Sequence, residues 1–305
     1  MSGSHRWTKK PGPGCRGCRW ATVAVVSLLV LVLVGCGPTV SPAATGAHTG
    51  AATPSAGGSS KATAGTPDPQ PPPPPVTGSC HNYPYLRITG YSNNAPPVDC
   101  ASPHTAYTFA VRRLPRRVIV PGVAISNTTV QDAAAMICQR AFGRFVGGTP
   151  TTRALSRLSV TYFVAPQRAF NRGAHWVRCD VVALLTRHRL APLPKRPLAA
   201  FLDGKDALRR YGVCSSAAPT SSGSQLVACM WAHEYRAVTA ISLGPTHSTY
   251  PGLSVAKVWG QRKCRRHIAG LVGTSDGYTF AWTYPTRHDW RAHQRFGYCW
   301  LKTTH

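Results

Sequence analysis

The stretch Cys100-Ala101-Ser102-Pro103-His104 returns later in the chain as Cys229-Met230-Trp231-Ala232-His233, with the cysteine and the histidine in the same places. Each copy leads into a β-prone run, which covers residues 107–111 in the first case and 237–241 in the second. A motif that recurs in this way is the signature of a repeated structural unit. The sequence therefore predicts two copies of one small domain.

Matching positions on both sides of this motif extend the repeat. Each copy has one cysteine before the motif and two after it, so that the eight cysteines divide four and four: Cys80, Cys100, Cys138 and Cys179, then Cys214, Cys229, Cys264 and Cys299. The segment Phe170-x5-Trp176-x2-Cys179 has the spacing of Trp290-x5-Phe296-x2-Cys299, with the two aromatic residues exchanged. We predict tandem domains at residues 78–190 and 208–305, joined by a linker at 191–207.

Each copy contains one segment with helical periodicity. In the first copy, apolar residues recur at helical spacing from Val130 onward, with Thr129 as the expected cap and Cys138 on the inward face. In the second copy, Ser254 is the expected cap, and Cys264 lies on an apolar stripe. The other segments are typical of short strands separated by turns. The predicted fold class is α+β, with one helix packed on a short-stranded antiparallel sheet in each disulfide-stapled domain.

The N-terminal residues have the pattern of an export signal. A basic segment without acids precedes the apolar run from Trp20 to Val34, which as a helix of about 22 Å is short for a hydrocarbon core of about 30 Å. The sequence Leu33-Val34-Gly35-Cys36 resembles a bacterial lipobox, in which the cysteine receives a diacylglyceryl group. We expect a lipoprotein signal peptide at 1–35 and a lipidated Cys36 that anchors the protein to the extracytoplasmic face of the cell membrane.

Residues 36–77 are rich in Ala, Thr, Ser, Gly and Pro and end in a run of prolines. This composition cannot build a packed core and is typical of a flexible tether with a stiffer end. We therefore predict that the segment is disordered and separates the domains from the membrane.

The residues after the tether resemble the septum formation domain family of actinobacterial membrane proteins and lipoproteins. The resemblance rests on Val98-Asp99-Cys100 with Pro103-His104 in the first copy, and on Val227-Ala228-Cys229 with Tyr284-Pro285 in the second. It implies two tandem copies of the family's domain and a role in septum formation or cell-envelope assembly.

An even number of cysteines in each copy of an exported protein favours disulfides within each copy. Four cysteines allow three connectivities, of which we favour the pairing of neighbours along the chain. The alternative is a zinc site at Cys100 and His104 or at Cys229 and His233, since Cys and His four residues apart could share an ion on a helix. We expect neither a metal nor another cofactor.

One incomplete motif set points to an enzyme. Ser254-x-x-Lys257, Ser275-Asp276-Gly277 and Lys302-Thr303-Thr304 resemble, in order, the three motifs of serine penicillin-recognising enzymes. Two of the three motifs have a different last residue, with Gly277 in place of Asn and Thr304 in place of Gly. All three fall within a short stretch of the second copy. We expect that the protein is not an enzyme, with a serine-type cell-wall enzyme that uses Ser254 and Lys257 as the alternative.

The charge balance indicates an anionic partner. The chain has 35 Lys and Arg against 9 Asp and Glu, a formal net charge of +26. Two clusters are the candidate anion-binding residues: Arg112, Arg113, Arg116 and Arg117, then Arg262, Lys263, Arg265 and Arg266. Outside the membrane the available polyanions are anionic lipids and wall polymers, not nucleic acid. The leading hypothesis is a non-enzymatic lipoprotein that binds such a surface, or a division or envelope protein.

Overall fold

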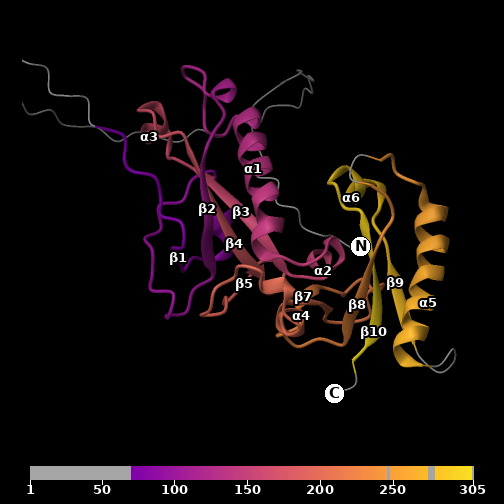
Figure 1. The fold of residues 1–305 in the computed structure, drawn as a ribbon. Coiled ribbons are helices and arrows are strands. Elements are labelled where there is room, and N and C mark those ends of the chain that lie inside the picture. The colour runs from indigo at the N-terminus through magenta and orange to yellow at the C-terminus, as the bar shows by residue number, and fades with distance from the viewer. Residues whose placement is uncertain (1–69, 246–247, 274–278, 304–305) are drawn as a thin grey trace, which may run out of the picture. The chain divides into compact units, whose positions relative to one another are not determined.

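The computed structural model describes residues 70–303 except 246–247 and 274–278 (Figure 1). The predicted signal peptide, Cys36 and the predicted tether up to residue 69 lie outside the described residues. Within the described part of the chain, no helix has the length and the apolar composition that a membrane span requires.

The first sheet is antiparallel, with the strand order β1-β2-β4-β3 and the short strand β5 also paired with β4. Its strands are β1 (Cys80–His81), β2 (Ala106–Arg113), β3 (Leu158–Val164), β4 (Trp176–Leu184) and β5 (Leu190–Ala191). Its helices are α1 (Thr128–Val146), α2 (Pro150–Ala154) and α3 (Gln167–Asn171), with short 3-10 turns at η1 (Tyr85–Thr89) and η2 (Arg116–Val118).

The second sheet is also antiparallel, with the strand order β7-β6-β8-β10-β9. Its strands are β6 (Val213–Ser215), β7 (Leu226–Ala228), β8 (Tyr235–Ser242), β9 (Phe280–Thr283) and β10 (Phe296–Lys302). The helices of this part are α4 (Ala207–Tyr211), α5 (Gly260–Val272) and α6 (Arg287–Arg291), with the turns η3 (Phe201–Asp203) and η4 (Val255–Trp259).

The two sheets have corresponding strand orders. β1, β2, β4 and β3 of the first sheet correspond in order and direction to β6, β8, β10 and β9 of the second. The chain forms the long helix before β3 in the first sheet and before β9 in the second, and α1 lies along the first sheet as α5 lies along the second (Figure 1). This arrangement confirms the prediction of a mixed fold of helices and antiparallel sheets.

The cap of helix α1 lies two residues before the predicted one. The side chain of Asn127, not of Thr129, accepts the capping hydrogen bond, which the Thr129 amide donates at 2.9 Å. The prediction of Thr129 as the cap was therefore wrong. The apolar stripe is as expected, because Val130, Ala134 and Cys138 are fully buried against the sheet.

Helix α5 is preceded by the π-helical turn η4, for which Ser254 is the N-cap residue. The Ser254 side chain makes no capping hydrogen bond, so its predicted capping role was wrong. Instead, the Trp282 indole donates to the carbonyl of Ala256 at 3.0 Å inside this wide turn. The Trp282 ring packs so closely on Gly260 and Gly297 that neither position has room for a Cβ atom.

Four disulfides join the eight cysteines, in the pairing of neighbours that we favoured from the sequence. Cys138 of α1 is bonded to Cys179 of β4, and Cys264 of α5 is bonded to Cys299 of β10, so that each long helix is attached to the central part of its sheet. The other two bonds join Cys80 to Cys100 and Cys214 to Cys229.

The predicted linker at 191–207 is a packed segment. Leu198, Phe201, Leu202 and Ala207 are buried in the core that α1 forms with the first sheet. The backbone of this segment is also fixed, because the Ala200 amide donates to the carbonyl of Phe145 at 2.8 Å. These residues therefore contribute to the stability of the first core.

Candidate functional site

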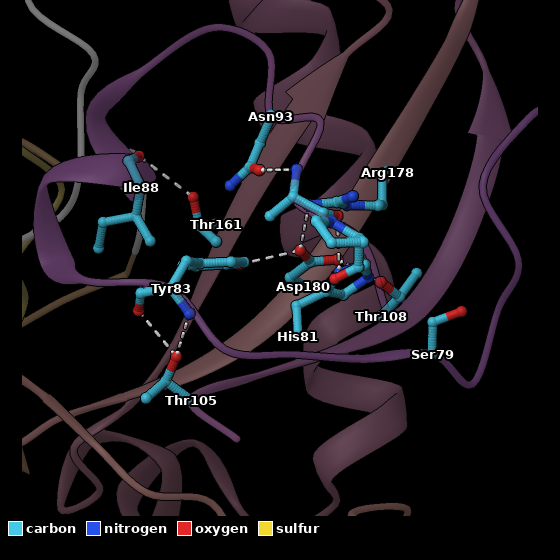
Figure 2. Close-up of polar contacts among 12 residues, drawn as sticks. Ser79, His81, Tyr83, Ile88, Asn93, Thr105, Thr108, Thr161, Arg178 and Asp180 are labelled. Carbon is cyan, nitrogen blue, oxygen red and sulfur yellow. Dashed lines mark hydrogen bonds and ion pairs between the residues drawn. The ribbon is translucent and has the colours of Figure 1, made fainter. Parts of the chain in front are cut away.

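A group of charged and polar side chains lies buried on the face of the first sheet opposite α1. Because successive side chains of a strand point to opposite faces, Arg178 and Asp180 point away from the helix to which their neighbour Cys179 is bonded. The end of β1 contributes His81, and the segment that follows β1 covers this face and contributes Tyr83 and Asn93 (Figure 2).

The carboxylate of Asp180 is the centre of this group. Its Oδ2 atom accepts a hydrogen bond from the Tyr83 hydroxyl at 2.9 Å and lies 3.0 Å from Nη2 of Arg178. Its Oδ1 atom accepts from the Thr108 hydroxyl at 2.7 Å. Asp180 is 0% exposed and Arg178 is 3% exposed, so this is a buried ion pair whose charges depend on each other (Figure 2).

Two further contacts surround the ion pair. The guanidinium carbon of Arg178 lies 4.9 Å from the centroid of the Phe163 ring, which is the cross-strand neighbour of Arg178 on β3. Burial and the adjacent carboxylate raise the pKa of Tyr83 well above its usual value, so the phenol stays protonated and donates a hydrogen bond to Asp180.

His81 lies at the edge of this group. Its Nδ1 atom is 3.2 Å from the carbonyl of Ala95 and 3.3 Å from that of Pro96, and because carbonyls only accept, Nδ1 carries the proton. Burial, and then the positive charge of Arg178, lower the pKa of His81 below the usual 6.5, although Asp180 acts in the opposite direction. The imidazole is therefore neutral, and its buried Nε2 atom has no hydrogen-bond partner among the described residues.

The chemistry available to this group is limited by its burial. The carboxylate already accepts hydrogen bonds from two hydroxyls and is ion-paired with an arginine, and the two charged side chains have almost no contact with solvent. We conclude that the group organises the first sheet and is not a binding surface. The sequence signal that could have revealed it is the pair of opposite charges at Arg178 and Asp180 within an otherwise apolar strand.

The second sheet has no corresponding charges at the equivalent positions. Cys299 of β10 corresponds to Cys179 of β4, since each is bonded to the long helix of its sheet. The residues that flank Cys299 are Tyr298 and Trp300, which are buried, and the Trp300 indole donates to the Thr283 hydroxyl at 2.9 Å. An aromatic core therefore takes the place of the ion pair.

The two Cys-x-x-x-His motifs differ in how they are used. Cys100 is bonded to Cys80, and Nδ1 of the buried His104 lies 2.9 Å from the carbonyl of Ser102. Near the second motif, the sulfur atoms of Cys229 and of its disulfide partner Cys214 and a ring nitrogen of His233 lie within 4.8 Å of one another. Both of those sulfurs are in one disulfide, so they offer no thiolate to a metal ion.

The eight candidate anion-binding residues lie in two exposed clusters. Arg112 and Arg113 end β2, and Arg116 and Arg117 begin η2, with all four side chains exposed. The other cluster is on α5, where Arg262, Arg265 and Arg266 are exposed and Lys263 is half-buried. The sequence predicted these basic residues, but it did not reveal the exposed apolar side chains that precede them on the same helix.

Some arginines have an internal role instead. Arg157 is buried, and its Nε atom donates to the carbonyl of Leu184 at 3.1 Å. Burial lowers the pKa of Arg157 to about 10. Nη1 of Arg295, also buried, donates to the Trp290 carbonyl, and the guanidinium carbon lies 4.1 Å from the centroid of the Trp290 ring. Some of the arginines therefore stabilise the core by hydrogen bonds to backbone carbonyls, and the others contribute to the positive charge of the surface.

The residues of the enzyme alternative are only partly described. The side chains of Ser254 and Lys257 are exposed at the start of the helix that leads into α5. The predicted second motif at residues 275–277 lies outside the described residues, as does Thr304. Lys302 is the last residue of β10.

Comparison with known protein families identifies the family of this chain. The model of a family described as septum formation matches residues 77–301, which include all of both sheets except Lys302 and all four disulfides. No curated protein and no solved structure matches the chain. Because the matched region covers well over half of the sequence, the chain belongs to the septum formation family.

Proposed function

We propose that this protein is a non-enzymatic, lipid-anchored protein of the extracytoplasmic membrane face that acts in septum formation or envelope assembly by binding an anionic surface or a protein partner. The observation that carries the proposal is the exposed basic cluster of α5, residues 262–266, in a chain that has few acids. Membership of the septum formation family supports the division role.

The charge balance supports an external anionic partner. From residue 80 onward there are 29 Lys and Arg against 8 Asp and Glu, so most of the cations cannot have a carboxylate partner within the chain. A large exposed excess of one sign attracts oppositely charged surfaces. Lipid headgroups and phosphorylated or uronic wall polymers are such surfaces.

The disulfides support an extracytoplasmic address. All eight cysteines after Cys36 are paired, and structural disulfides form and persist in oxidising compartments. The basic segment, the apolar run and the lipobox-like sequence before Cys36 agree with export through a lipoprotein pathway.

We also propose that the two sheets arose by tandem duplication of one domain. The corresponding strand orders and the corresponding helix-to-sheet disulfides support this origin. The copies then diverged, since the first keeps a buried ion pair where the second has Tyr298 and Trp300. In this proposal the first copy mainly stabilises the protein, and the second copy carries α5, the helix that binds the anionic surface.

Two measurements in an actinobacterial host test the anchor and the division role. Metabolic labelling with an alkyne fatty acid reports the anchor, and microscopy of the septa reports the division role. We expect label on the wild-type chain and none on Cys36→Ala, and we expect septa to be misplaced or incomplete when only Cys36→Ala is expressed. Normal septa in cells that lack the protein would contradict the division role. Label that survives in Cys36→Ala would contradict the anchor.

A fluorescent acylating β-lactam tests the serine-enzyme alternative. If Ser254 were a nucleophile, the purified protein would be labelled covalently, and Ser254→Ala would lose the label. We expect no label on either protein, with a penicillin-binding protein in the same membranes as the positive control.

A further inference from the structure

The outer face of the helix that runs from η4 into α5 exposes large apolar side chains. Leu253 is 60% exposed, Val255 46%, Val258 44% and Trp259 40%. The opposite stripe of the helix, which includes Ala256, Cys264 and Ile268, is fully buried against the sheet. The exposed side chains are therefore not needed for the contact between helix and sheet.

The same helix is strongly basic. Its cations are Lys257, Arg262, Lys263, Arg265 and Arg266, and the sequence from 253 to 273 contains no Asp or Glu. Helix α1 differs, because it contains Asp132, and Met136 is its large exposed apolar residue. The combination of exposed apolar and cationic side chains distinguishes α5 from its counterpart in the first sheet.

The apolar and cationic side chains adjoin each other. Val258 and Trp259 line one shallow surface hollow together with Arg262, Arg265 and Arg266. Nζ of Lys263 lies 3.9 Å from the centroid of the Trp259 ring, a cation–π contact that helps to hold this ring in place on the surface. The hollow thus offers guanidinium groups beside an apolar wall, which suits a phosphate ester that carries a hydrocarbon chain.

A lipid bilayer satisfies both kinds of side chain at once. Aliphatic and Trp side chains enter the boundary between headgroups and acyl chains to a depth of about 5–10 Å, while cations stay at the phosphates. A hydrophilic wall polymer would leave Leu253, Val255 and Val258 in water. The predicted tether of residues 36–77, with an extension of about 35 Å, keeps this face within reach of the membrane.

We infer that the outer face of η4 and α5 docks on the anionic headgroup surface of a phospholipid bilayer. In this docked state Leu253, Val255, Val258 and Trp259 enter the interface, and Arg262, Arg265 and Arg266 contact lipid phosphates. The inference rests on the proposed function and makes it specific, because it names the anionic surface and the helix that binds it.

Hydrogen exchange of the full-length protein in proteoliposomes tests this inference. One set of vesicles contains phosphatidylcholine alone, and the other contains phosphatidylcholine with phosphatidylglycerol. We expect the amides of residues 253–266 to exchange more slowly in the anionic vesicles only. Fluorescence gives a second readout, because brominated lipids should quench the emission of the wild type more than that of Trp259→Phe.

Matched charge variants decide whether α5 itself is responsible. Since each cation near an anionic membrane contributes about fivefold to binding, Arg262→Gln/Arg265→Gln/Arg266→Gln should lower the docking constant about a hundredfold. The control Arg112→Gln/Arg113→Gln/Arg116→Gln removes the same charge from the other exposed cluster and should leave the protection of α5 intact. Val258→Ser/Trp259→Ser should lose protection although it keeps every cation. Unchanged far-UV circular dichroism would confirm that each variant is folded.

Three results would overturn the inference. The first is equal exchange of residues 253–266 in both kinds of vesicle. The second is protection in native membranes but not in vesicles of either composition, which would mean that a protein covers this face. The third is protection by a soluble wall polymer without lipid. The mass of the N-terminal peptide reports lipidation of Cys36 separately, so a failed anchor is distinguished from a failed docking face.

Discussion

The Nη2 atom of Arg178 and the Oδ2 atom of Asp180 lie 3.0 Å apart beneath the segment that follows β1. Neither side chain can be neutralised without leaving the other as a buried charge. Removing one partner of a buried ion pair is far more costly than replacing both by apolar groups. The two residues are therefore best tested together.

We expect Asp180→Asn to lower the free energy of unfolding by about 3–5 kcal/mol, because it leaves the charge of Arg178 buried without a counter-ion. Denaturation in guanidinium chloride measures this loss. The double variant Arg178→Met/Asp180→Leu should recover most of it, since no charge then remains in the site. If the double variant were as unstable as Asp180→Asn, the ion-pair explanation would be wrong.

The neutral His81 should make stability depend on pH. Its pKa is lowered in the folded protein, so below the usual value of 6.5 the unfolded chain binds a proton that the native chain does not. The free energy of unfolding should therefore fall as the pH decreases from 6.5 to the lowered native pKa. Denaturation at a series of pH values measures this slope.

His81→Gln should reduce that slope, because glutamine does not titrate. The exposed His288, which lies outside this buried group, provides the matched control for a histidine-to-glutamine change. His175, whose pKa is also lowered by burial, accounts for a residual slope in His81→Gln. An identical pH dependence of wild type and His81→Gln would exclude His81 as its source.

Two glycines of α5 should respond in opposite ways to alanine. Gly260→Ala places a methyl group against the Trp282 ring and should cost about 1–3 kcal/mol through overpacking. Gly270 has open space around its Cα atom, so Gly270→Ala should gain up to about 1 kcal/mol from helix propensity. Thermal unfolding compares the two. A neutral Gly260→Ala would show that α5 does not need its close approach to the sheet.

The two helix-to-sheet disulfides should contribute similar stability. Their cysteines are 41 and 35 residues apart in sequence, and cross-links of this loop length contribute about 3–4 kcal/mol through the unfolded chain. We expect Cys138→Ala/Cys179→Ala and Cys264→Ala/Cys299→Ala each to lower the free energy of unfolding by this amount. A large difference between them would mean that packing of the two helices, and not loop closure, determines the effect.

The sequence was sufficient to predict both long helices and the mixed helix and sheet content, because these depend on local periodicity. It left three disulfide connectivities open in each copy, and the structure has the one that we favoured. The sequence was not sufficient for the site around Asp180. The opposite charges in an apolar strand mark the position, but whether Arg178 and Asp180 face solvent or core depends on the segment with Tyr83 that folds over the sheet. The wide turn before Gly260 likewise depends on Trp282, a residue distant in sequence.

The order of the disulfides has a consequence for how the protein matures. Each bond joins one cysteine to the next along the chain: Cys80 to Cys100, Cys138 to Cys179, Cys214 to Cys229 and Cys264 to Cys299. If the chain is exported from its N-terminus, as proposed, and oxidised as it emerges, the partner of each second cysteine is the free thiol that emerged just before it. In that case we expect a simple oxidant to produce the native pairing during translocation without an isomerase.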